Sequence, residues 1–495
     1  METISQDEIK YHPQSFADNS MRVFWWQEQI YRALRFKSAT FFRKLFQDGV
    51  IQNLIDQDLL VESELTPLAL DGYEMVIRHR KIPFVSYPDE WCAAMYKDAA
   101  LVTIDLAIEL AQWDLTLRDA HPWNVLYDID KGKPVYVDWG SIAPIYSSTW
   151  SDYGLFCNFF LYPLLFMSYG QDRIARLLIA ADEFGVLESD LSKLIGRSSL
   201  SGVRLKASLA SRLKLFLGQN VQRLSNSHHQ HFKRTLNWIS SRISKNAHNL
   251  ESTLESLEKK SHLNSLENVR RQVDSIILPA FQVKRLGHYD KSSLSVSPQD
   301  DWTIKQKNIH KILTELQPSS VLDIGSGTGW YSKLAALLGS KVVAFDIDES
   351  CITQLYHEAR ENNLPILPLI INFTKPTPAR GLADRAGISA IDRFQCDLVL
   401  ALGLVHHIAL GLVNPIVGKQ IVNFDQIAEG LALFSKEWVI VEFVPFAAQK
   451  LEEWYSSSYP WYKLDNFVNA LRKQFRHVTI MPSHPQHCVL LLCQK

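Results

Sequence analysis

Three glycines spaced two residues apart, together with two aspartates, have the types and spacing of a nucleoside-binding turn. Residues 321–329 read Val-Leu-Asp-Ile-Gly-Ser-Gly-Thr-Gly, and a second apolar run, 341–345, ends in Asp346. Glycine lets the backbone turn tightly and approach a ligand closely, because no Cβ atom blocks positive φ angles or contact. An acidic residue about 20 positions after such a turn, at the end of the next strand, suits the two hydroxyls of a ribose.

The G-x-G-x-G spacing, with Asp323 two residues before it, resembles motif I of the class I S-adenosylmethionine-dependent methyltransferases. A dinucleotide-binding turn has G-x-G-x-x-G and feeds a helix that faces a pyrophosphate, whereas S-adenosylmethionine has no phosphate. The resemblance implies that Asp346 binds the ribose. It also implies that the methionine part is held by Asp323, Gly325, Ser326, Gly327 and Gly329. A glycine turn without a ligand is the alternative.

Polar residues also follow later apolar runs, where the ends of parallel strands are expected. Asn372 either contacts the adenine ring, as polar residues near this position often do in the family, or forms a turn. His406 and His407 follow the run 398–402. A neutral imidazole there could deprotonate an acceptor hydroxyl or amine, because a His pKa of about 6.5 suits a general base; packing under a loop is the alternative. Glu442 either orients a substrate or is structural.

The aromatic residues between 446 and 466 form either an acceptor lid or, as we expect, a small hydrophobic cluster. Methyl transfer from a sulfonium is an in-line displacement, and much of its rate can come from alignment of the acceptor alone. The activity therefore does not require a dedicated acid or base.

The N-terminal half carries a second motif. Asp119 is followed five residues later by Asn124, and Asp138-Trp139-Gly140 follows a short hairpin. This pattern resembles the catalytic loop and metal-binding turn of the protein-kinase-like fold. The resemblance implies that Asp119 accepts a substrate proton, while Asn124 and Asp138 hold magnesium on the phosphates of Mg-ATP. Asp152 either braces this loop or caps a helix.

The kinase-like pattern is incomplete. Leu117 stands where many kinases have His, and residues 1–75 contain neither a Gly-x-Gly-x-x-Gly loop nor a Val-Ala-Ile-Lys strand. Lys37 is the nearest candidate for a lysine that pairs with phosphate. Magnesium and ATP are therefore expected only if this half is active. The alternative is a degenerate fold whose Asp and Asn residues make hydrogen bonds or bind an acceptor.

Strand-like runs alternate with helix-like segments in the C-terminal part, which predicts an α/β fold with a mostly parallel, doubly wound Rossmann-like sheet. Ligands of such sheets bind beyond the carboxyl ends of the strands. The expected strands are 320–324, 341–346, 366–371, 396–402, 438–444, 476–481 and 487–493. The apolar run 155–167 is shorter than the ~20 residues of a membrane span, so we expect a buried helix.

The expected domains are a kinase-like α+β domain at 20–200, a helical extension at 201–284, a polar linker at 285–300 and the methyltransferase domain at 301–495. In the extension, apolar residues from Leu250 onward recur at helical spacing and predict an amphipathic helix that ends before Pro279. The 495 residues exceed what one core can organise, which agrees with several domains.

Composition narrows the function classes. The net charge is −1, which argues against a nucleic-acid partner. The six cysteines show no CxxC spacing, and Met1 to Gln14 lacks an apolar signal core. We therefore expect reduced thiols in a cytoplasmic protein without a membrane span. The histidines at 228, 229 and 231 lie in a polar stretch and are expected to be solvated rather than metal ligands.

A wider resemblance covers most of the chain. Residues 83–91, 97–101 and 401–407 resemble a bacterial group that includes nodulation-associated methyltransferase-like proteins. It implies an S-adenosylmethionine-dependent methyltransferase that acts on a small-molecule or glycan-type acceptor, with an N-terminal recognition or regulatory module. The alternatives are a bifunctional methyltransferase and phosphotransferase, and a binding or scaffold protein without chemistry. The acceptor and the oligomeric state stay open.

Overall fold

The structure is a computed structural model of the chain. It describes residues 2–12, 15, 20–145, 149–181, 184–194, 247–279, 294–295, 297–381, 387–410, 422–446 and 459–495, and of 247–260 the backbone alone. The chain forms two compact units. The first comprises Met1–Ala99, Val125–Val137 and Ala280–Lys495, and the second comprises Ala100–Asn124 and Asp138–Pro279. The histidines at 228, 229 and 231 lie outside the described residues, as do most of the expected linker and of the helical extension.

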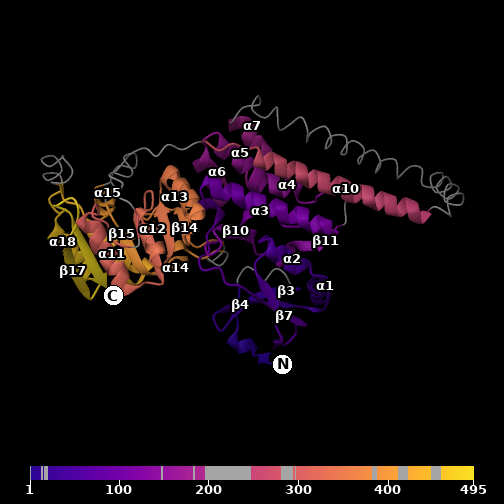
Figure 1. Ribbon diagram of the computed structural model, residues 1–495, viewed down its shortest axis with the longest axis horizontal. Coiled ribbons are helices and arrows are strands. Elements are labelled where there is room, and N and C mark those ends of the chain that lie inside the picture. Colours follow the sequence, from indigo (N-terminus) through magenta and orange to yellow (C-terminus); the bar gives the residue numbers. More distant parts are fainter. Residues whose placement is uncertain are drawn as a thin grey trace. The chain divides into compact units, whose positions relative to one another are not determined.

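A seven-stranded sheet organises the C-terminal part of the first unit (Figure 1). Its order is β14-β13-β12-β15-β16-β18-β17. The first five strands of this order pair in parallel, and β18 runs antiparallel to both of its neighbours. The bounds are β12 Ser320–Ile324, β13 Lys341–Asp346, β14 Ile366–Ile370, β15 Cys396–Ala401, β16 Ser435–Phe443, β17 His477–Pro482 and β18 Val489–Gln494. The mostly parallel sheet is thus confirmed, with each expected strand near its observed place.

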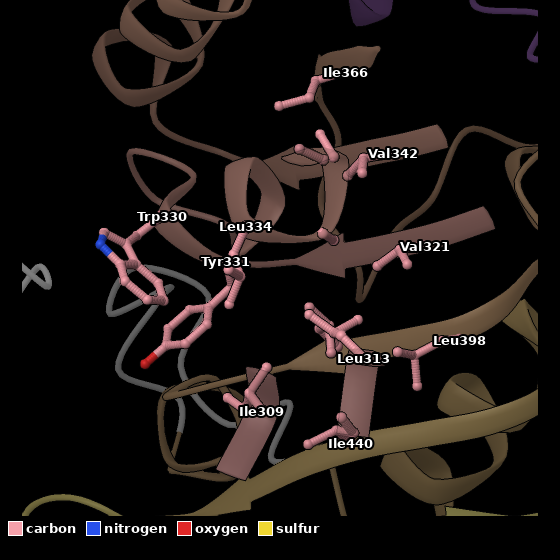
Figure 2. Close-up of a cluster of buried hydrophobic side chains, with 14 of the residues drawn as sticks. Ile309, Leu313, Val321, Trp330, Tyr331, Leu334, Val342, Ile366, Leu398 and Ile440 are labelled. Carbon is pink, nitrogen blue, oxygen red and sulfur yellow. The ribbon is translucent and has the colours of Figure 1, made fainter. Parts of the chain in front are cut away.

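Helices cover this sheet because its central strands are mostly apolar and must be buried on both faces. Helices α11 (Ile304–Leu316), α12 (Trp330–Leu337) and α13 (Glu349–Glu361) share one hydrophobic cluster with the strands, which Figure 2 shows. Its side chains include Ile309, Leu334, Val342 and Ile440. A second group of helices comprises α14 (Ala390–Arg393), α15 (Val405–Ala409), α16 (Phe424–Phe434) and α18 (Leu464–Arg472). Among these, α16 packs against α14 and α18.

The N-terminal part of the first unit contains a five-stranded antiparallel sheet with the order β2-β3-β4-β7-β5. Two helices, α1 (Phe36–Gln47) and α2 (Val50–Asp56), lie between β4 and β5 along the chain. The strands are β2 Lys10–Tyr11, β3 Met21–Trp26, β4 Gln29–Leu34, β5 Ser63–Leu65 and β7 Met75–His79; a separate pair is β1 Thr3–Ile4 with β6 Ala69–Leu70. The expected hairpin is present as β9 (Val125–Asp128) and β10 (Lys133–Tyr136).

The second unit is mainly helical. Strand β8 (Leu115–Leu117) pairs with β11 (Ile142–Pro144) and precedes the loop that carries Asp119. The helices are α3 Ala93–Gln112, which begins in the first unit, α4 Tyr153–Phe156, a π-helical turn Cys157–Leu161, α5 Tyr162–Ser168, α6 Asp172–Ala181, α7 Glu188–Leu194 and α10 Ala247–Asp274. The expected helices at 155–167 and from Leu250 onward are therefore confirmed. Among the described residues, no helix combines the length and apolarity of a membrane span.

Candidate functional site

The glycine turn between β12 and α12 depends on its glycines. Gly325, Gly327 and Gly329 have φ angles of 74°, 54° and 74°, which residues with a Cβ atom rarely adopt. A Cβ on Gly329 would lie 2.4 Å from a methyl carbon of Leu355. The amides of Gly325 and Ser326 both donate to the carbonyl of Phe345, at 2.8 and 3.0 Å, so the turn is attached to the end of β13.

The two expected acids meet at this turn. Asp346 accepts hydrogen bonds from the amides of Gly327 (2.8 Å) and Asp348 (2.9 Å). Asp323 is buried and accepts from the Ser332 hydroxyl at 2.6 Å. Burial raises the pKa of Asp323 to about 6, and the nearby Asp346 adds to the rise. Burial raises the pKa of Asp346 as well. The fold therefore holds two carboxyl groups beside the glycines, at the point where the strand order reverses.

The residues after β14 and β15 lie at the same edge of the sheet, because parallel strands end together. The Oδ1 atom of Asn372 accepts from both the amide and the hydroxyl of Thr374, at 2.9 Å each, so this side chain forms a turn. His406 and His407 lie in α15 with ring centroids 4.0 Å apart. Burial, with smaller contributions from His407 and Lys305, lowers the pKa of His406 to about 3, so this imidazole is uncharged at neutral pH.

Two buried polar atoms at this edge suit a nucleoside cofactor. Ser326 Oγ and His406 Nδ1 have no hydrogen-bond partner among the described residues. A buried polar group that lacks a partner is costly, and a bound ligand can supply one. Gly325 adds to the cradle, since a Cβ there would lie 3.1 Å from Leu404. The residues present thus fit S-adenosylmethionine.

Glu442 lies near the end of β16, and the structure gives it a partner that the sequence pattern does not reveal. Its Oε2 atom accepts from Lys305 Nζ at 2.8 Å, and its Oε1 atom accepts from the Ser483 hydroxyl at 2.5 Å. Lys305 lies in the first turn of α11. The sequence gives only a slight indication of this ion pair, namely a lysine in the helix that precedes β12, the first strand of this sheet along the chain.

Among the aromatic residues of the 446–466 segment, Phe446, Tyr459, Trp461 and Tyr462 are described. The rings of Trp461 and Tyr462 belong to one aromatic cluster. Both rings contact Phe424, with centroids 5.0 and 5.3 Å away, and Tyr462 stacks on Phe443 at 4.9 Å. For these two residues the hydrophobic cluster is confirmed. Trp454 and Tyr455 lie outside the described residues.

In the second unit, Asp119, Asn124 and Asp152 form one hydrogen-bonded loop. Asp119 has a φ of 52°, and its amide donates to Asp152 Oδ1 at 3.0 Å. The side-chain amide of Asn124 donates to the Asp119 carbonyl at 2.9 Å. Asp152 thus braces the loop, and its side chain makes no hydrogen bond that caps α4. Positive φ at a residue other than glycine is strained, which marks Asp119 as held in place by its surroundings.

Asp138 closes the turn after the β9–β10 hairpin. It accepts from the Gly140 amide at 3.2 Å and from the Ser141 hydroxyl at 2.6 Å. Within the described ranges, no three or more His, Cys, Asp and Glu side chains are grouped so that they could hold a metal ion. The six cysteines are all buried thiols, and none forms a disulfide.

Lys37, the candidate for a phosphate-pairing lysine, lies exposed in the first turn of α1. The buried cation of the N-terminal sheet is instead Arg32, in the middle of β4. Its Nε atom donates to His79 at 3.4 Å, and one terminal nitrogen lies 3.5 Å from the carbonyl oxygen of Val137, the residue before Asp138. Burial, aided by Arg32, lowers the pKa of His79 well below its usual value.

Comparisons with known proteins give one curated relative and several structural neighbours. No protein-family profile matches the chain. Nodulation protein NoeA of Rhizobium meliloti (strain 1021) is 26% identical over 419 residues, which cover 81% of this chain and 80% of NoeA. The bifunctional kinase-methyltransferase WbdD matches with a TM-score of 0.28 and 17% identity, over 38% of this chain and 37% of WbdD.

A second neighbour is magnesium protoporphyrin IX methyltransferase (ChlM) from Synechocystis PCC 6803 with bound SAM. It matches with a TM-score of 0.26 and 15% identity, over 40% of this chain and 88% of ChlM. The structures that resemble this chain thus include S-adenosylmethionine-dependent methyltransferases. The chain spans well under half the length of WbdD.

Proposed function

We propose that the chain is an S-adenosylmethionine-dependent methyltransferase that acts on a small-molecule or glycan-type acceptor. The observation that carries this proposal is the glycine turn, with three positive φ angles, joined to Asp346 through the Gly327 amide. In this arrangement Asp346 binds the ribose hydroxyls, and Asp323 with the turn binds the methionine part. The similarity to NoeA supports the assignment to the nodulation-associated group.

The bound cofactor would supply an electrophilic methyl group, and the chain's residues would align the acceptor with it. His406 lies in the first turn of α15, the helix that follows β15, and it is uncharged at neutral pH, so its imidazole can accept a hydrogen bond. A base with a pKa of about 3 holds an abstracted proton weakly. We therefore assign His406 to orientation of the acceptor, and we assign the same role to its neighbour His407, whose pKa burial also lowers. Asn372, whose Oδ1 atom forms a turn, is assigned to the adenine side of the cofactor.

Calorimetric titration with S-adenosylmethionine tests the proposal. The wild-type chain should bind one equivalent, and Asp346→Asn should bind at least tenfold more weakly, because hydrogen bonds to a charged group contribute about 1.5–3 kcal/mol. Asp465→Asn, an exposed substitution in the first turn of α18, is the matched control and should bind like the wild type. If the wild type binds no cofactor, the methyltransferase is refuted and the scaffold alternative gains support.

We further propose that residues 20–200 form a kinase-like module that recognises the acceptor or regulates the enzyme. Two features support it: helices α1 and α2 lie between strands β4 and β5 of the N-terminal antiparallel sheet, and Asp152 braces the loop of Asp119 and Asn124. The bifunctional alternative requires Mg-ATP. Titration of Mg-ATP into the wild type and Asp138→Ala tests it: binding that Asp138→Ala abolishes would identify a nucleotide site and support the bifunctional enzyme, and no binding by the wild type would exclude it.

A further inference from the structure

A buried ion pair lies at the edge of the sheet where the proposed cofactor site is found. The side chains of Lys305 and Glu442 are 14% and 3% exposed, and their charged atoms are 2.8 Å apart. Removing two charges from water costs several kcal/mol per ion, and an apolar pair of similar volume often serves a fold as well or better. The pair is therefore weak evidence for stability, and its place in the fold suggests another role.

Glu442 is fixed from both sides. One carboxylate oxygen accepts from Lys305 and the other from the Ser483 hydroxyl. A Cβ on Gly403, which follows β15, would lie 3.9 Å from Glu442 Oε2. The carboxylate thus lies beneath the loop that leads into α15 and its histidines, and it holds the lysine in one position.

The ammonium of Lys305 can donate hydrogen bonds besides the one to Glu442, because a lysine carries three N–H groups. Its Nζ lies 5.3 Å from the centroid of the Tyr331 ring, which belongs to the first turn of α12, directly after the glycine turn. The same ammonium acts on the pKa of His406 and of Asp323, which places it within electrostatic range of both. Lys305 therefore lies between the glycine turn and the ends of β15 and β16.

We propose that Lys305 binds the acceptor's oxygen, so that the acceptor is an oxygen nucleophile, either a hydroxyl or a carboxylate. This inference rests on the proposed methyltransferase function. An ammonium attracts a developing oxyanion and repels a protonated amine, which selects oxygen over nitrogen. Glu442 is a positioning residue that holds the ammonium in place.

The step balances without a further reactant. The ammonium favours the ionised form of a bound hydroxyl, whose proton is released to solvent; a carboxylate needs no deprotonation. The oxygen then attacks the methyl carbon, the O–C bond forms as the C–S bond breaks, and the electron pair of that bond remains on sulfur. The products are a methyl ether or methyl ester and the thioether S-adenosylhomocysteine.

Acetate is a simple probe of such an oxyanion site. The full chain, saturated with S-adenosylhomocysteine, is titrated with sodium acetate by calorimetry. Acetate should bind the wild type, and Lys305→Met should bind it about tenfold or more weakly, because a charge-assisted hydrogen bond is lost. Lys305→Arg should retain binding. Lys311→Met is the control, since Lys311 is exposed on the same helix and should leave acetate affinity unchanged.

Glu442→Gln separates this role from a structural one. Neutralising the carboxylate leaves the ammonium uncompensated, so acetate should bind more tightly than to the wild type, an effect that damage to the fold does not produce. Lys305→Met/Glu442→Gln, which leaves no buried charge at this place, should lose acetate binding while it keeps S-adenosylhomocysteine.

Two results would overturn the inference: no acetate binding by the wild type, or equal acetate affinity in Lys305→Met. Failure of S-adenosylhomocysteine to bind would refute the methyltransferase instead. Acetate titration of the cofactor-free chain would then still decide whether Lys305 binds an oxyanion.

Discussion

The ion pair between Arg393 and Glu90 gives the sharpest prediction about stability. The two side chains are 2% and 1% exposed, and they join residues 303 positions apart within the first unit. Arg393 also donates to the carbonyls of Ile388 (2.9 Å) and Val85 (2.6 Å), and its guanidinium carbon lies 3.9 Å from the centroid of Tyr87. Each of the three guanidinium nitrogens therefore donates at least one hydrogen bond.

Arg393→Met removes the cation and leaves the Glu90 carboxylate buried, with the Tyr87 amide as a remaining donor at 2.7 Å. Breaking a buried pair in this way costs about 3–5 kcal/mol, because the remaining charge is uncompensated. At a urea dependence of about 3 kcal/mol/M, the unfolding midpoint of the first unit should fall by about 1–2 M. Equilibrium unfolding in urea, followed by tryptophan fluorescence and circular dichroism, measures the shift.

Two variants control for this result. Lys473→Met breaks an ion pair with Asp425 whose side chains are 61% and 56% exposed, and it should cost less than about 1 kcal/mol. Glu90→Gln/Arg393→Met leaves no buried charge and should recover part of the loss. If Arg393→Met costs no more than Lys473→Met, the reasoning from burial is wrong for this pair.

Three further predictions concern the proposed sites. Burial raises the pKa of Asp323 from 3.8 to about 6, so between these pH values the folded chain keeps a proton that the unfolded chain has lost. The free energy of unfolding, measured by urea titration, should therefore fall as the pH rises from about 4 to 6, and Asp323→Asn should remove this decrease. Gly329→Ala should lower stability by about 1–3 kcal/mol and weaken S-adenosylmethionine binding, because its φ of 74° and the contact with Leu355 both oppose a Cβ; unchanged affinity in calorimetry would contradict this. Asp152→Ala should destabilise the second unit by about 1 kcal/mol through loss of the bond to the Asp119 amide, and unchanged hydrogen exchange at that amide would refute the bracing role.

Much of the proposed cofactor site follows from local sequence. Gly325, Gly327 and Gly329 occupy positive φ angles that few other residues tolerate, so their spacing alone indicates the turn. Strands β12 and β13 consist mostly of apolar residues, and parallel strands buried on both faces require such runs. Asp346 is the last residue of strand β13, so the apolar run before it already indicates that its side chain lies at the carboxyl edge of the sheet.

The partners of these residues could not be predicted in the same way. The Oδ1 atom of Asn372 accepts hydrogen bonds within its own turn, and these depend on the position of Thr374. The bracing role of Asp152 required the strained backbone of Asp119 to come within 3.0 Å of it. The hydrogen bonds of these polar side chains are set by tertiary geometry, which a residue's type and spacing do not specify.

By itself, the sequence determined the succession of strands and helices along the C-terminal part of the chain and the presence of the glycine turn, because apolar periodicity and backbone φ preferences are local properties. Only the tertiary structure brought Lys305 to Glu442 and Arg393 to Glu90, across 137 and 303 residues. Such pairs form because a buried charge must find a partner wherever the chain's packing provides one. The acceptor chemistry that we infer therefore rests on a contact that sequence spacing does not encode.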